Sequence, residues 1–176
     1  AADKPMSSRD VSYILRKTGF EPSPLEVSQW VGEYRSTLIA NLIEGLKTDP
    51  VNNYPAWTKL EPRYWGQQDW PESKRSAFRS ARRQEVSELR QWWITQMLAS
   101  KSPLAERMVL FWENTFVAGF SGLDEKSHAQ WMHHKTIRNY ATGNYRELLH
   151  SMVKDPAVLI YLDNNRNERE SPNENL

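Results

Sequence analysis

The stretch Met108–Phe120 constrains the fold more than any other part of this chain. Its residues are apolar on nearly every side of a 3.6-residue period, which is typical of a helix surrounded by other helices. Three consecutive polar residues, Glu113, Asn114 and Thr115, interrupt it, and a buried carboxylate or amide needs a hydrogen-bonding partner. We therefore expect a buried central helix over about residues 102–120, with its polar residues as the first place to look for chemistry.

Helical periodicity and helix-capping signals recur along the rest of the chain. Ser23, Pro24 and Glu26 supply an N-cap, a first-turn proline and a capping-box glutamate, and Ser102 followed by Pro103 predicts a similar start for the central helix. Other helices are predicted over residues 8–18, 38–46, 124–142, 144–153 and 157–162. The longest is expected from about residue 72 to 100, with an apolar stripe made by Phe78, Val86, Leu89, Trp93 and Met97. Because no segment alternates as a strand would, the sequence predicts an all-α multi-helix bundle.

Composition limits the domain count and the classes of partner. A chain of 176 residues fits a single domain, here with a loose leader at residues 1–7 and a polar tail at residues 164–176. A net charge of +1 gives no reason to expect a nucleic-acid partner. The absence of cysteine excludes disulfides, thiolate metal sites and cysteine nucleophiles. The longest apolar run is too short for a transmembrane segment, so we expect none.

The amino terminus bears on localisation. The chain begins Ala1, Ala2 and Asp3 without an initiator methionine, as it would after cleavage of an export signal at a small-residue site. A trimmed chain would begin in the same way. With that alternative open, the sequence predicts a periplasmic or secreted protein.

Residues 48–70 form a segment rich in proline and aromatic residues in which no helical or strand period survives. We expect a long loop whose rings hold it to the surface, and loops of this length usually have a functional or structural reason. One interpretation is an aromatic binding surface, such as a platform for sugar rings. The favoured interpretation is a strap whose rings fill grooves between helices. The candidate binding residues are Tyr54, Trp57, Tyr64, Trp65 and Trp70.

Arginines accumulate along the first half of the long predicted helix. Arg75, Arg79, Arg82 and Arg83 fall near one helical face and would form a ladder for phosphates or another polyanion. The alternative, which we favour, is a solvated face on which these arginines pair with glutamates at i,i+3 and i,i+4 spacing. The aromatic residues that a single-strand nucleic-acid binder interleaves with its cations are missing from this face.

Glu113 together with His133 and His134 is the best candidate for catalysis. A carboxylate and an imidazole could hold a divalent metal or act as acid and base, yet the chain contains no diagnostic metal, phosphate-loop or nucleophile motif. No cofactor is therefore indicated. The plainer interpretation, which we favour, is a buried Glu113 paired with Arg107 or Arg138. Consecutive histidines cannot share one helical face, so we expect at most one to point inward and the other to be solvated.

The segment from Asp163 to Asn175 is rich in asparagine and acidic residues, a composition that could suggest calcium. It lacks the order of ligands found in a calcium-binding loop. We expect its amides instead to cap helix ends and to bond the loop backbone.

Several separated motifs occur together and in a fixed order. They are Phe20 with Pro22-Ser23-Pro24 and Glu26-Val27, the block from Ser102 to Trp112, the run from Gly143 to Leu149, and Asp155 to Asn164 followed by Pro172-Asn173-Glu174-Asn175. With these motifs the chain resembles the bacterial domain-of-unknown-function family 1800 over nearly its whole length. The resemblance implies an all-helical, often exported protein and assigns no reaction.

The chain departs from that family in two ways. Members typically read Trp-His-Asn-His-Phe where this chain has Trp112 to Phe116, so both histidines of that motif are replaced. Members also continue past the Pro-Asn-Glu-Asn motif, which makes this chain resemble the amino-terminal part of a longer protein. Apolar helical faces would then be exposed and would need a partner, either the missing carboxyl-terminal part or another protein chain.

These observations favour a non-catalytic role. We expect a protein-interaction or assembly module, an accessory subunit of an envelope or extracellular complex. One alternative is a metal-assisted hydrolase that uses Glu113 with His133 or His134. A second is a polysaccharide-binding module that uses the tryptophan-rich loop.

Overall fold

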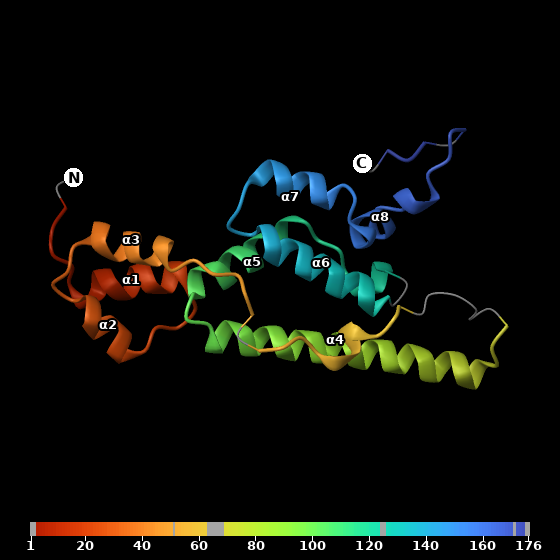
Figure 1. Ribbon diagram of the computed structural model, residues 1–176, viewed down its shortest axis with the longest axis horizontal. Coiled ribbons are helices and arrows are strands. Elements are labelled where there is room, and N and C mark those ends of the chain that lie inside the picture. Colours follow the sequence, from red (N-terminus) through yellow and green to blue (C-terminus); the bar gives the residue numbers. More distant parts are fainter. Residues whose placement is uncertain (1–2, 51, 63–68, 124–125, 171, 175–176) are drawn as a thin grey trace.

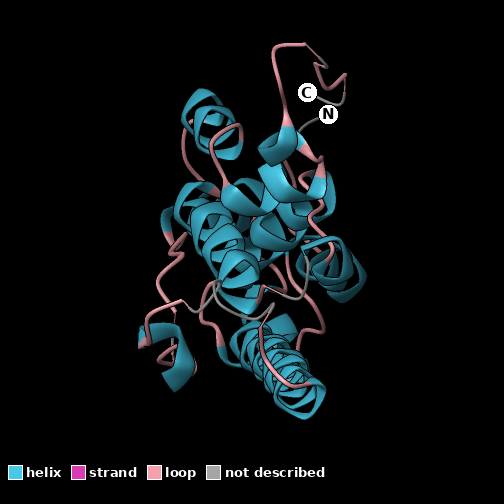
Figure 2. Ribbon diagram, turned by 90° about the vertical axis from the view of Figure 1, so that its right-hand side faces the viewer, coloured by secondary structure: helices cyan, strands magenta, loops and turns pink. Residues whose placement is uncertain are grey.

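The computed structural model describes residues 3–50, 52–62, 69–123, 126–170 and 172–174. These residues form eight α-helices and three short 3₁₀ turns, and their one β-bridge joins Pro5 to Tyr34. The predicted all-α bundle is confirmed. Helices α1–α3 form a small head and the five helices α4–α8 form a body. Figure 1 shows the head and the body at opposite ends of the molecule. Figure 2, which looks along the long axis, shows helices and loops among the described residues and no strand.

The head consists of α1 (Ser8–Thr18), α2 (Pro24–Trp30) and α3 (Arg35–Glu44). Both α1 and α2 start with a capping box, and the one at Ser23 is the box that the sequence predicts. Met6 is buried in the head core, and its backbone N–H donates to the carbonyl of Glu33 at 2.9 Å. The described residues of the expected loose leader are thus held in place, because burying Met6 removes an apolar side chain from water.

Helix α4 (Glu72–Ala99) is the predicted long strut and runs beneath α5 and α6 (Figure 1). Its 28 residues span about 42 Å. Two members of the expected stripe, Val86 and Leu89, are buried, but Trp93 is only half-buried. The buried face of α4 includes Trp92 and Gln96 instead of Trp93, because the loop at residues 52–60 covers that side of the helix.

Helix α5 (Pro103–Thr115) confirms the predicted helix in part. It ends five residues before the expected limit of 120, where the N–H of Phe116 donates to the carbonyl of Trp112. Ser102 does not cap it. Its hydroxyl instead accepts the backbone N–H of Lys47 at 3.2 Å. One side of α5 is also open, since Phe111 is 54% exposed.

Helix α6 (Ser127–Tyr140) has the largest set of buried residues in the described part of the chain. It packs against α4, α5, α7 (Tyr145–Met152) and α8 (Pro156–Tyr161). These buried residues include both histidines and an arginine, so the centre of the body is a helix with many polar residues. The apolar character of Met108–Phe120 did not reveal this arrangement.

The tail behaves as its amides predict. After the turn at Asn164–Arg166, the Asn173 side chain donates to the carbonyl of Leu162 at 2.6 Å. The side-chain oxygen of Asn167 accepts the N–H of Asn173 at 3.0 Å. These bonds fold the described part of the tail back onto the end of α8. Among the described residues, no helix has the length and apolar character needed to cross a lipid bilayer.

Candidate functional site

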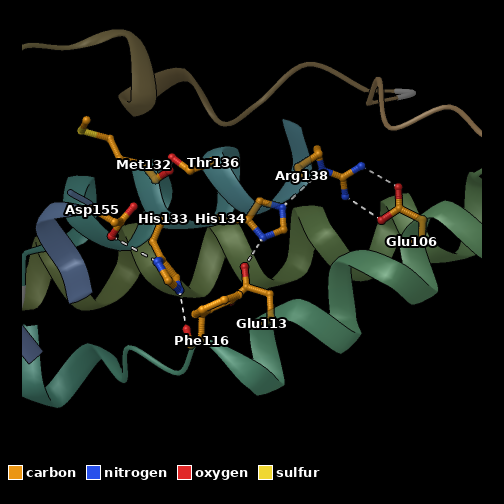
Figure 3. A network of polar contacts seen from close by, with 9 residues as sticks. All are labelled: Glu106, Glu113, Phe116, Met132, His133, His134, Thr136, Arg138 and Asp155. Carbon is orange, nitrogen blue, oxygen red and sulfur yellow. Dashed lines mark hydrogen bonds and ion pairs between the residues drawn. The ribbon is translucent and has the colours of Figure 1, made fainter. Parts of the chain in front are cut away.

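Arg138 and Glu106 form a deeply buried ion pair, with both side chains 2% exposed (Figure 3). Two parallel hydrogen bonds, of 2.7 and 2.6 Å, join the guanidinium on α6 to the carboxylate on α5. Arg138 also donates to the carbonyl of Thr48 at 3.0 Å, at the start of the aromatic loop. Bidentate geometry is the strongest form of this interaction, and here it joins α5, α6 and the loop.

His134 connects this pair to Glu113. Its Nδ1 lies 2.8 Å from a carboxylate oxygen of Glu113, and its Nε2 lies 3.4 Å from Nε of Arg138. Because the arginine can only donate, Nε2 must accept and the proton lies on Nδ1. His134 therefore links the carboxylate of Glu113 to the guanidinium of Arg138. Glu113 accepts from a histidine, so the expectation that Arg107 or Arg138 pairs with it directly is wrong.

His133 lies one residue earlier and uses different partners. Its Nδ1 is 3.1 Å from Asp155 and its Nε2 is 2.7 Å from the carbonyl of Phe116, both of which are acceptors. Burial lowers the pKa of His133, but the hydrogen bond to Asp155, the charges of Glu113 and Asp155 and the carbonyl of Phe116 raise it more, so the pKa lies above its ordinary value. A protonated ring can donate from both nitrogens, as this geometry requires.

Both histidines are buried, so the expectation that one would be solvated is wrong. Figure 3 shows the two rings on the same ribbon, one beside Asp155 and the other between Glu113 and Arg138. They need not share a face, because α6 is covered on several sides by neighbouring helices. A helix on the surface would have placed one of them in water.

Asp155 fixes the start of α8. One carboxylate oxygen accepts the backbone N–H groups of Ala157 and Val158 in addition to the bond with His133. The other oxygen is buried, and the described residues supply it with no hydrogen-bond partner. A single carboxylate therefore caps a helix and holds a buried imidazolium.

The chemistry open to these groups is limited by their mutual bonding. Each ring nitrogen of His133 and His134 already has a protein partner. Within the described ranges, no three His, Asp or Glu side chains are grouped so that they could hold a metal ion. The arrangement holds charges and a proton at fixed positions inside the body.

The candidate binding residues of the aromatic loop lie in several environments. Tyr54 stacks on Trp92 with ring centroids 4.4 Å apart, and Trp57 is buried against the edge of the His128 ring. Trp70 is half-buried and meets Phe78 edge-on at the start of α4. The remaining two candidates, Tyr64 and Trp65, lie outside the described residues. In the described part, the rings pack between the loop and α4 or α6.

The arginines proposed as a polyanion ladder have carboxylate partners on their own helix. Arg75 and Arg79 lie 2.9 and 3.7 Å from Glu72, and Arg82 lies 2.6 Å from Glu85. The guanidinium of Arg82 also lies over the ring of Phe78. The fourth arginine, Arg83, is exposed and also has an interaction partner. This face therefore carries i,i+3 pairs along with its cations.

A family model described as a protein of unknown function, DUF1800, matches residues 13–176. The chain belongs to the DUF1800 family. No curated protein and no solved structure matches it. The predicted resemblance is confirmed, and the geometry of this DUF1800 chain supplies the remaining functional argument.

An apolar surface over α5 and α7 of this DUF1800 chain was not named in the sequence-based predictions. We call it the α5–α7 surface and define it by Phe111, Trp112, Tyr145, Leu149 and Val153. Trp112 stacks on Tyr145 with centroids 5.6 Å apart and meets Phe111 edge-on at 4.8 Å. The apolar positions of residues 145–153 follow the i, i+3, i+4, i+7 and i+8 spacing of one ordinary buried stripe, so the sequence contained no signal that part of this stripe is exposed.

Proposed function

We propose that this chain is a non-catalytic protein-interaction module and that its partner is a helix of another protein chain. The observation that carries the proposal is the α5–α7 surface. Its open side chains include Phe111 at 54%, Tyr145 at 56% and Val153 at 44% exposure. Contiguous exposed apolar groups of this kind are typical of interaction sites in soluble proteins.

The shape of the surface favours a helical partner. Tyr145, Leu149 and Val153 follow one another at four-residue spacing and form a ridge along α7. The rings of Phe111 and Trp112 on α5 lie beside that ridge. Two adjacent helices that expose apolar side chains next to one another present a surface on which the apolar face of an amphipathic helix can pack.

The polar residues of α6 support a structural role better than a catalytic one. Their hydrogen bonds join α5, α6, α8 and the loop to one another, and the side chain of Glu113 is only 14% exposed. The metal-assisted hydrolase built on Glu113 with His133 or His134 would need ring nitrogens that are already bonded. We further propose that the module serves as an accessory subunit of an envelope or extracellular complex.

Co-purification of epitope-tagged variants from the organism that makes this protein tests the proposal. Leu149→Glu/Val153→Glu places two charges on the α5–α7 surface, and Ile94→Glu/Leu98→Glu is a matched control on exposed apolar residues of α4. We expect the wild type and the control to retain one stoichiometric partner chain and the first variant to lose it. A photo-cross-linker at Phe111 should attach to the same partner.

The proposal is overturned if the wild type has no stoichiometric partner or if the surface variant keeps it. Circular dichroism and thermal melting establish that each variant is folded. Glu113→Gln should also retain the partner. A hydrolytic activity of the wild type that Glu113→Gln abolishes would favour the hydrolase instead, and tryptophan fluorescence changes with glycans alone would favour polysaccharide binding.

A further inference from the structure

A groove of about 620 Å³ is lined by residues of α1 and α5. These two helices meet where the head joins the body (Figure 1). Four of its six lining residues are cations, two carry hydroxyl groups, and none is acidic. They are Arg9, Ser12, Tyr13, Arg16, Lys17 and Arg107. This concentration of positive charge contrasts with the net charge of +1 for the whole chain.

The groove is built from one face of α1 and one side chain of α5. Residues three, four and seven positions apart lie on the same side of a helix, so Arg9, Ser12, Tyr13 and Arg16 form a continuous row. Arg107 reaches the row from α5, since its guanidinium lies over the ring of Phe20 and donates to the carbonyl of Arg16 at 3.5 Å.

Close packing fixes the distance between these two helices. A Cβ atom added to Gly19 would lie 2.9 Å from Cβ of Pro103, closer than side chains approach. The end of α1 can therefore meet the start of α5 only because residue 19 is a glycine. Arg107 follows Pro103 by about one helical turn, which places it opposite the cations of α1.

Nearby carboxylates leave much of this positive charge uncompensated. Glu21 pairs with Arg16 at 3.2 Å. Asp10 bonds to Ser7 in the capping box, and Glu106 is fully engaged by Arg138. The negative end of the α1 dipole favours Arg16 and Lys17 in the last turn, but it does not account for Arg9 in the first.

We propose that this groove binds a phosphate group of a phosphorylated ligand. A phosphate monoester or diphosphate carries the two or more negative charges that such a site neutralises, whereas one carboxylate would leave most of the charge unbalanced. Guanidinium groups recognise phosphate through paired hydrogen bonds, and the hydroxyls of Ser12 and Tyr13 add donors. The bound group would contact α1 and α5 together. The groove shares no residue with the α5–α7 surface, although Arg107 and Phe111 lie one turn apart on α5, and the proposal does not require the proposed partner.

Isothermal titration calorimetry of the full chain at low ionic strength tests the site, with inorganic pyrophosphate as the soluble probe. Arg16→Gln/Arg107→Gln removes a cation from each side of the groove. Arg90→Gln/Lys154→Gln removes the same charge from exposed positions on α4 and after α7. We expect one pyrophosphate per chain, with affinity reduced about tenfold or more in the groove variant and by less than about twofold in the control.

A second arm uses vesicles containing phosphatidic acid, since the same phosphate chemistry occurs in lipid headgroups. Binding to the vesicles but not to pyrophosphate, with loss in the groove variant alone, would place the phosphate on a lipid. Lys17→Gln is a further single change at an exposed position, and it should also weaken binding. This variant keeps the test possible if the double groove variant fails to fold. The proposal is overturned if neither probe binds or if groove and control variants weaken binding equally.

Discussion

Arginine–carboxylate pairs occur in two different settings in this protein. On the surface of α4, the side chains of Arg79 and Glu72 are 49% and 65% exposed. Between α5 and α6, both side chains of the Arg138–Glu106 pair are 2% exposed. The groups are chemically the same, but the surface pair can exchange its partner for water and the interior pair cannot. The burial of each pair, rather than its residue types, therefore decides how much its loss changes the free energy of unfolding.

The largest expected effect is at the interior pair. Arg138→Ala leaves the Glu106 carboxylate buried without its partner, so the free energy of unfolding should fall by about 3–5 kcal/mol. Urea denaturation at neutral pH measures this change. Replacing both residues, as in Arg138→Met/Glu106→Leu, should recover much of the loss, because no charge then remains buried. A loss below about 1 kcal/mol in the single variant would contradict the comparison.

Asp155 extends the comparison to helix caps. Asp155→Ala removes the cap of α8 and the carboxylate beside His133, so we expect a loss of about 2–4 kcal/mol in the free energy of unfolding. Asn144→Ala is the matched change at the exposed cap of α7 and should cost about 1 kcal/mol. Equal losses in the two variants, measured by urea denaturation, would show that burial of the cap has no additional effect.

The pH dependence of stability sharpens the same contrast. Because its folded-state pKa is raised, protonated His133 contributes stability that is complete below the unfolded-state pKa of about 6.5 and is lost as pH rises through the folded-state pKa. The groups that face its ring are Asp155 before α8, Glu113 on α5 and the carbonyl of Phe116. Urea denaturation at a series of pH values from about 6.5 upward should show a falling free energy of unfolding in the wild type and in His150→Gln, an exposed control. His133→Leu should not show this fall. An unchanged pH profile in His133→Leu would contradict the assignment.

The smallest effect is expected on α4. Arg79→Ala removes an exposed partner of Glu72, and its cost should stay below about 1 kcal/mol, because exposed ion pairs gain little over solvated charges. Thermal and urea denaturation at low and high salt measure it. A loss comparable to that of Arg138→Ala would remove the distinction between the two settings.

The parts of the fold that sequence predicted well depend on neighbouring residues. The capping box at Ser23 and the limits of α1 and α7 involve contacts within about one helical turn. Ser102 resembled these caps, yet its hydroxyl bonds to Lys47, which is 55 residues away in the chain. The same local pattern does not form a cap here, because the hydroxyl bonds to a residue that is distant in the sequence.

Only part of the candidate site could be predicted from the sequence. Glu113, His133 and His134 were singled out as candidates for chemistry, and all three belong to the network, although one of the two histidines was expected in solvent. Glu106 and Asp155 were missed, because an isolated carboxylate at a helix start is typical of a solvated residue. Their burial depends on α6 being enclosed by four other helices.

The sequence by itself determined that this chain forms helices, where most of them begin and end, and that it belongs to the DUF1800 family. Those properties rest on spacings and caps that act within a few residues. The tertiary structure alone decided which polar residues are buried and with whom they pair. Glu106 and Arg138 are 32 residues apart and meet only when α5 packs on α6, where the absence of water makes their pairing necessary.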